Sequence, residues 1–231
     1  MARIDELSFP RIKSLVLVVN LRARALALVC FLACAGCSTF ETPATNAMTA
    51  SIGIAISPGK SVDDAPLAPG IGYLRVTLDG AVALFALGFV DHDANGAIEV
   101  YYGPGREVLR LQNGRLLGID GVAISWKSVS VSSNPGWSEK NPTINRRRDI
   151  APGERYDLND QITVVRSPPA PDHLSGLDPA ALSWFDDVTD DLPRAHVALD
   201  GAGTPVYGEQ CLDQVHCLTW QLWPPATGAG P

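Results

Sequence analysis

Residues 73–131 alternate apolar and polar positions with a period of two, which is the pattern of half-buried β-strands. Asp-Gly or Asn-Gly pairs stand at three of the junctions, and they predict tight hairpins because both turn positions favour positive φ. The pattern predicts an all-β fold, an antiparallel meander that forms a sandwich or a partly closed barrel. The expected strands are 73–79, 81–90, 97–102, 107–112, 115–119 and 122–131.

The second half of the chain has weaker patterns. Residues 132–148 are polar, so a boundary near 132–150 could divide the β domain, 67–231, into two β-units. Weak strands are expected at 155–158 and 161–165, and final strands at 194–199, 205–208 and 217–223. One short helix is expected near 178–187, because Asp178 and Pro179 suit the N-cap and first helical positions.

The N-terminus has the pattern of an export signal. Five basic residues precede the apolar run 25–36, which is too short for a membrane-spanning helix and suits a signal peptide. Ala35-Gly36-Cys37 then resembles the lipobox of bacterial lipoproteins, although the usual Leu three places before the cysteine is Cys34 here. The expected division is a signal peptide, 1–36, and a lipidated tether, 37–66, that starts with the lipid on Cys37.

Other interpretations of this segment remain open. They are an ordinary secretory signal, an uncleaved anchor that begins near Ser14, and lipidation of Cys34 instead of Cys37. The long basic region also suggests that translation starts nearer residues 19–21.

Composition and charge exclude several functions. The formal charge is −7 and no basic stripe is visible, which argues against binding to nucleic acid. Four His and five Cys are too few for a large metal framework. Residues 1–36 contain five basic and two acidic side chains, so the mature chain is more acidic still, and membrane attachment would come from the lipid.

No segment shows a catalytic or cofactor motif. Residues 91–98 match the first half of a calcium loop, but Tyr102 stands where a bidentate Glu belongs, so we expect a polar hairpin without metal. The acidic pairs Asp186-Asp187 and Asp190-Asp191 are interpreted as a solvated loop. We therefore expect no enzyme activity, no cofactor and no metal.

Aromatic and basic residues offer a contact surface. Trp126 and Trp184 are expected to pack, whereas Trp137 lies in a polar segment and is the tryptophan expected to be exposed. Together with Arg146, Arg147 and Arg148 it is the candidate contact surface, because aromatic and Arg side chains dominate binding hot spots.

Cys211 and Cys217 are expected to form a disulfide. They are the cysteines that remain beyond the signal segment and the lipidated position, and an exported protein lies in an oxidising compartment. The bridge would close a short loop between the last two strands.

Residues 66–122 resemble the YjbF/GfcB family of capsule polysaccharide lipoproteins. The resemblance lies in the Tyr-Leu-Arg-Val strand at 73–76, the Glu-Val-Leu to Asn-Gly-Arg-Leu hairpin at 107–116 and the Gly-Ile-Asp-Gly that follows it. It implies an all-β periplasmic lipoprotein encoded with machinery for extracellular polysaccharide, and it carries no catalytic residues.

The expected function is therefore a non-enzymatic accessory role in the production or export of extracellular or capsular polysaccharide. Ser38 in place of Asp favours the outer membrane, with the β domain facing the periplasm. Export or assembly proteins are the expected partners, and the polysaccharide itself is a candidate ligand. The alternatives are a secreted glycan-active enzyme, which needs a cleft with paired carboxylates, and a calcium- or glycan-binding module with its ligand at 91–95 or near Trp137.

Overall fold

Two of the three Asp-Gly and Asn-Gly pairs form the tight turns that the sequence predicts. Asp79 and Gly80 have φ of 49° and 81°, and Asn113 and Gly114 have φ of 49° and 75°. Both pairs join directly paired strand ends, as type I′ turns do. At the third site the two turn residues are Ala94 and Asn95, so this turn lies one residue earlier than expected.

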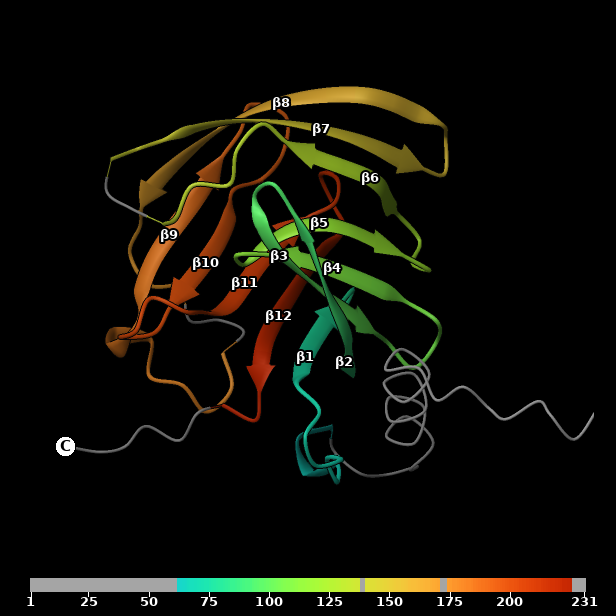
Figure 1. Ribbon diagram of the computed structural model, residues 1–231, viewed down its shortest axis with the longest axis vertical. Coiled ribbons are helices and arrows are strands. Elements are labelled where there is room, and N and C mark those ends of the chain that lie inside the picture. The colour runs from blue at the N-terminus through green and yellow to red at the C-terminus, as the bar shows by residue number, and fades with distance from the viewer. Residues whose placement is uncertain (1–61, 138–139, 171–173, 226–231) are drawn as a thin grey trace, which may run out of the picture. The chain divides into compact units, whose positions relative to one another are not determined.

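The computed structural model describes residues 62–137, 140–170 and 174–225 (Figure 1). The strands of its first half are β1 (Tyr73–Leu78), β2 (Ala81–Asp93), β3 (Gly96–Tyr102), β4 (Val108–Gln112), β5 (Arg115–Asp120) and β6 (Ser125–Val131). Those of its second half are β7 (Thr143–Ala151), β8 (Arg155–Arg166), β9 (Ser183–Val188), β10 (Ala195–Leu199), β11 (Pro205–Cys211) and β12 (Cys217–Trp223). Two short 3-10 helices, η1 (Val62–Asp64) and η2 (Pro179–Ala181), complete the described elements.

These strands form a closed antiparallel barrel. Each strand pairs with its neighbours in sequence, and β1 pairs with β12 from Tyr73↔Trp223 to Leu78↔Leu218, which closes the sheet. The all-β antiparallel meander is therefore confirmed, and of the sandwich and the partly closed barrel that the sequence left open, the chain forms a barrel, which is closed. The strands on both sides of residues 132–150 belong to this one sheet, and all of β7 but its last residue lies within that range.

The helix expected at 178–187 is wrong beyond its first turn. Asp178 does cap η2, since its carboxylate accepts a hydrogen bond from the Ala180 amide at 2.9 Å. The chain then leaves the helical conformation at Leu182, and β9 pairs with β8 and β10. Pairing on both edges satisfies the backbone groups of this segment and overrides the local helix signal.

The barrel wall has apolar clusters on both faces. Leu74, Leu109, Leu218 and Trp126 come from separated strands and pack together, so they fill the interior. Tyr73 and Trp184 lie on the outer face. Residues of the segment 62–71 pack over Tyr73, and Ala170, Leu174 and Leu182 pack over Trp184. Trp126 and Trp184 are thus both buried, as predicted. The described part of the chain contains no helix that is long and apolar enough to cross a membrane.

Several sequence predictions lie outside the described residues. These are the signal peptide, 1–36, the lipidated Cys37, the alternative Cys34, and the tether up to residue 61. The last part of the expected tether is described: η1 lies there, and Val62 and Ala65 pack against the outer cluster around Tyr73.

Candidate functional site

A cluster of buried charges lies inside the barrel, on the adjacent strands β6, β7 and β8. The carboxylate of Asp160 accepts hydrogen bonds from the Arg146 Nε atom at 2.9 Å and from the Arg148 Nε and second guanidinium nitrogen at 2.6 and 3.0 Å. Both guanidinium groups lie over the Trp126 ring, at 4.7 and 5.0 Å from its centroid. We call Asp160, Arg146, Arg148 and Trp126 the interior charge cluster.

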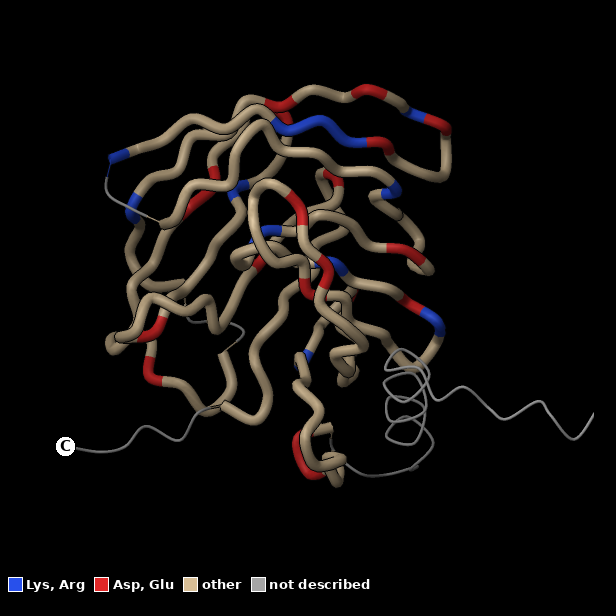
Figure 2. The backbone as a smooth tube through the Cα atoms, in the orientation of Figure 1, with Lys and Arg blue, Asp and Glu red and all other residues tan. Residues whose placement is uncertain are grey.

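The Arg triplet is therefore not the contact surface that the sequence suggests. β7 alternates, so Arg146 and Arg148 point into the barrel and are 5% and 3% exposed. Only Arg147 lies outside, where it pairs with Asp157 at 3.3 Å. Figure 2 shows the run of basic positions along β7. Period-two geometry sends neighbouring side chains to opposite faces, so the three charges cannot share one surface.

The pKa of Asp160 is lowered by its two partners. Burial raises this pKa, but the hydrogen bond from Arg148 and the positive charges of Arg146 and Arg148 outweigh the burial and hold it below its ordinary value. Burial in turn lowers the pKa of Arg146, against the opposing effect of Asp160. The cluster is a structural ion network, since each charge has an opposite charge in contact.

A second buried ion pair lies near one end of the barrel. Arg115 donates from Nε to Asp187 at 3.0 Å and from another guanidinium nitrogen to Asn134 at 2.6 Å. Trp137 covers this Arg, with the guanidinium carbon 3.7 Å from the centre of the indole, and donates from Nε1 to the Asn113 carbonyl oxygen at 2.9 Å.

One further sequence interpretation holds only in part, and another is wrong. Trp137 is only partly exposed, because it packs on Phe185 and on the inner cluster around Ile144. Asp186 and Asp187 are 2% and 6% exposed on β9 instead of solvated in a loop. Asp190 and Asp191 are exposed, as predicted.

Segments from four regions meet at this same end of the barrel. Asn95 of the β2–β3 turn donates to the Val131 carbonyl oxygen at 3.4 Å, and the Asn134 amide donates to the Gln112 carbonyl oxygen at 3.0 Å. Gly114 approaches Pro205 so closely that a Cβ atom would lie 2.7 Å from the proline ring, which only glycine allows. These contacts bring β3, the β4–β5 turn, the β10–β11 loop and β12 around one cavity.

The cavity, which we call the mouth pocket, has a volume of about 300 Å³. Its wall combines polar and apolar residues in about equal parts and includes no basic side chain. The residues that line it are Asn95, Ala97, Glu99, Gln112, Asn113, Gly114, Thr204, Pro205, Trp220 and Leu222.

Glu99 is the ionisable side chain of the mouth pocket. The Tyr101 hydroxyl donates to its carboxylate at 3.2 Å, and both side chains lie on the same face of β3. Burial raises the pKa of Glu99, and the hydrogen bond from Tyr101 opposes that rise only in part. Burial and the adjacent Glu99 charge also raise the pKa of Tyr101, which keeps the hydroxyl proton in place as a donor.

Gln112 and Trp220 complete the inner wall of the mouth pocket. Gln112 donates from Nε2 to Asp93 at 2.7 Å and to the Gly96 carbonyl oxygen at 3.2 Å, while its buried Oε1 atom has no hydrogen-bond partner among the described residues. Trp220 lies against Gly208, where a Cβ atom would come within 2.5 Å of the indole nitrogen. The pocket thus combines a carboxyl group, amides and an aromatic ring, a mixture suited to a small polar ligand.

The segment that resembles a calcium loop is part of a hairpin. Residues 91–93 end β2, and the Asp93 carboxylate accepts hydrogen bonds from the Asn95 amide at 2.7 Å and from Gln112. Asp91 accepts from the His92 amide at 2.8 Å. These carboxylates shape the hairpin and its contact with the pocket wall.

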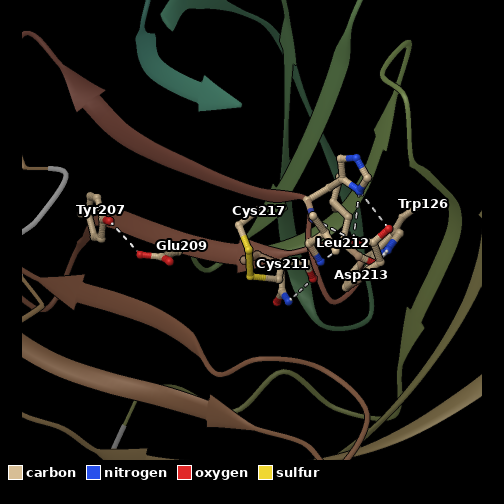
Figure 3. Close-up of a disulfide and its surroundings, with 10 residues drawn as sticks. Trp126, Tyr207, Glu209, Cys211, Leu212, Asp213 and Cys217 are labelled. Atoms are coloured by element: carbon tan, nitrogen blue, oxygen red, sulfur yellow. Dashed lines mark hydrogen bonds and ion pairs between the residues drawn. A yellow bond between two sulfur atoms is a disulfide. The ribbon is translucent and has the colours of Figure 1, made fainter. Parts of the chain in front are cut away.

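Cys211 and Cys217, which the sequence pairs, are joined by a disulfide at the last residue pair of the β11–β12 hairpin (Figure 3). The loop that it closes contacts the interior charge cluster, because the Trp126 indole donates to the Leu212 carbonyl oxygen at 3.0 Å. Asp213 accepts hydrogen bonds from the His216 and Val215 amides, which lower its pKa to about 2.

We expect replacement of both cysteines by Ala to lower the free energy of unfolding by about 2 kcal/mol, as chain entropy predicts for so short a loop. Urea denaturation of the oxidised protein and the double variant measures this difference. Alkylation without reductant supplies the check: if Cys211 and Cys217 are both labelled in the folded mature protein, the bridge is absent and the prediction fails.

The fold and the mouth pocket define an up-and-down barrel with a polar cavity at one end. No family model matches the chain, and no curated protein does. Among solved structures, the chain is similar to the crystal structure of the hypothetical lipoprotein YmcC from Escherichia coli (K12), with 12% identity and a TM-score of 0.49. The match covers 68% of this chain and 85% of that one. At this level the likeness assigns no function to the chain.

Proposed function

We propose that this chain is a lipid-anchored protein of the cell envelope that supports the production or export of extracellular or capsular polysaccharide without catalysing a reaction. The observation that carries the proposal is the resemblance of residues 66–122 to the polysaccharide lipoproteins. That segment runs from just before β1 to just before β6, so it includes β3 and the β4–β5 turn of the mouth pocket.

The location of the protein is part of the proposal. The Ala35-Gly36-Cys37 junction supports lipidation at Cys37, and Ser38 in place of Asp supports the outer membrane. The described β domain would then face the periplasm, where polysaccharide export or assembly proteins are its partners. Nucleic acid is not among them, because the chain is acidic.

The buried carboxylates support a structural role. Asp160 and Asp187 are each in contact with guanidinium groups inside the barrel and are closed off from solvent. A general acid or base must reach its substrate, so these groups are unsuited to catalysis. Among the described residues, the buried acidic side chains are these two and Asp186.

One observation favours the alternative of a glycan-active enzyme. Glu99 has a raised pKa and lines a pocket, which is the environment of many catalytic acids. Hydrolysis of a glycosidic bond by the usual route needs a second carboxylate across the cleft. Glu99 is the one acidic residue in the lining of the mouth pocket, so binding without turnover is favoured over hydrolysis.

Deletion of the gene tests the proposal. We expect extracellular polysaccharide to fall several-fold while the intracellular precursors remain present, because synthesis of the precursors precedes the step that this protein supports. Sugar analysis of culture supernatant, washed cells and cell extract measures both quantities. Unchanged extracellular polysaccharide, under growth conditions in which the parent strain makes it, would refute the proposal.

A further inference from the structure

We propose that the mouth pocket binds a single sugar residue that carries hydroxyl groups and no negative charge. The inference deepens the proposed function and rests on it for the choice of a sugar among small polar ligands. The pocket, its charge and its chemistry come from the described residues alone.

The size and shape of the pocket limit the ligand. Ligand sites in proteins range from about 300 to 1,000 Å³, so a cavity of about 300 Å³ accepts one ring-sized group and no folded partner. The β10–β11 loop and the β4–β5 turn form its rim, and Gly114 holds these two segments in contact through Pro205. Because the pocket is open to solvent, a ring at the end or along the side of a longer chain can enter it.

The charge of the pocket selects against anionic sugars. Glu99 lines the cavity, Asp93 contacts its wall through Gln112, and no Lys, Arg or His is among the lining residues. Inside the barrel, the guanidinium group of Arg115 is paired with Asp187, and those of Arg146 and Arg148 are paired with Asp160. A uronic acid or a phosphorylated sugar would therefore meet like charge without a compensating cation.

The polar groups suit hydroxyl groups. A carboxylate accepts two hydrogen bonds from neighbouring hydroxyls, and the donor Tyr101 orients the Glu99 carboxylate from behind. Asn95, Asn113 and Thr204 place further amide and hydroxyl groups on the rim. Trp220 and Leu222 supply the apolar wall against which the carbon face of a sugar ring can pack.

A matched pair of Tyr–Glu contacts makes the test specific. On β3, the Tyr101 hydroxyl donates to Glu99 at 3.2 Å inside the mouth pocket. On β11, the Tyr207 hydroxyl donates to Glu209 at 3.3 Å, and Glu209 does not line this pocket. Glu99→Gln and Glu209→Gln are thus the same chemical change in the same local contact, with only one of them at the proposed site.

A second pair of variants tests access to the mouth pocket. One variant blocks the opening, the other is its control, and neither changes the barrel interior. Thr204 and Ala202 are both exposed in the β10–β11 loop, but only Thr204 lines the mouth pocket. Thr204→Trp should fill the opening, whereas Ala202→Trp adds the same bulk outside it.

The experiment is isothermal titration calorimetry of the full mature lipoprotein in lauryldimethylamine oxide, a detergent without a sugar headgroup. The probes are maltotriose and N,N′,N″-triacetylchitotriose, which are neutral, and trigalacturonic acid, which is anionic. We expect a neutral trisaccharide to bind, and its Kd to rise at least tenfold in Glu99→Gln and Thr204→Trp. In Glu209→Gln and Ala202→Trp the Kd should stay within twofold of that of the wild type.

Three results would overturn the inference. They are the absence of binding by any neutral probe at about 10 mM, binding that survives Thr204→Trp, and trigalacturonic acid binding as tightly as the neutral probes. With any of these, a polysaccharide defect in the deletion strain would still support the proposed function, so the two failures are distinguishable. Cleavage of a trisaccharide by the wild type, lost in Glu99→Gln, would replace both with the enzyme alternative.

Discussion

Replacing Asp160 with Asn is expected to lower the free energy of unfolding by about 3–5 kcal/mol. The carboxylate is the acidic partner of both Arg146 and Arg148, and all three side chains are at most 5% exposed. The variant would leave two guanidinium groups buried without the negative charge that holds them. Urea denaturation followed by tryptophan fluorescence is a suitable measurement, because Trp126 lies against both guanidinium groups.

The pH dependence of this effect has a definite sign. The folded-state pKa of Asp160 lies below its ordinary value of 3.8, so its ionised form stabilises the folded protein. The stability difference between wild type and Asp160→Asn should be complete well above pH 3.8 and should shrink as the pH falls toward the folded-state pKa. A difference that is independent of pH down to acid unfolding would contradict the ionic role.

Asp157→Asn is the matched control for Asp160→Asn. Asp157 lies on the same strand but outside the barrel, where it pairs with Arg147 at 3.3 Å and both side chains are more than half exposed. Exposed pairs contribute about 0–1 kcal/mol, and Asn tolerates the positive φ of 54° at this position. Equal losses in the two variants would show that the interior charge cluster is not a main source of stability.

Replacing Cys37 with Ser is expected to abolish attachment to the membrane through a lipid. The lipid is the proposed anchor, and an acidic mature chain has no basic surface with which to bind anionic lipids. The variant should be recovered as an uncleaved precursor or as soluble protein, and it should not incorporate labelled palmitate. Fractionation of cells, together with the mass of the mature N-terminus, measures the change.

Cys34→Ser is the matched control for the lipidation site. It changes a cysteine three residues earlier in the same apolar segment and should leave lipidation and fractionation unchanged. If Cys34→Ser loses the lipid and Cys37→Ser keeps it, the cleavage site lies before Cys34. If Cys37→Ser fractionates and migrates like the wild type, the chain is not a lipoprotein at this position.

The strands and turns of the first half were predictable because their signals are local. A two-residue turn with positive φ at both positions needs residues such as the Asp79-Gly80 pair, and the alternating segments around it decide the register. The prediction of a helix at 178–187 was wrong because the decisive contacts are not local. Its N-cap is real, but the pairing of β9 with β8 and β10 involves residues that are distant in sequence.

The interior charge cluster was missed because its partners are non-local. Three consecutive arginines suggest a solvated turn, yet Ile144, Arg146, Arg148 and Ile150 form one period-two series whose middle members are charged. Two charged residues can be buried in this series because β8 places Asp160 beside them. Asp160 is the signal that sequence reasoning passed over, since an acidic residue lies among the inward positions of an alternating strand.

The mouth pocket could not be predicted from any one segment. Glu99 and Gln112 come from β3 and β4, whereas Thr204 and Trp220 follow about a hundred residues later in the chain. Only the pairing of β1 with β12 brings the two groups together. The sequence did indicate residues near the mouth pocket. The hairpin at 91–95 and Trp137, which it named as alternative ligand positions, both lie at this end of the barrel.

The most direct test of the account is the amount of extracellular polysaccharide in the deletion strain after one gene is returned to it. The strain receives the wild-type chain, the Cys37→Ser chain or no gene, and intracellular precursors are measured in the same cultures. The account predicts that the wild-type chain alone restores extracellular polysaccharide, while precursors are present in all three strains. Equal extracellular polysaccharide in all three strains would contradict it.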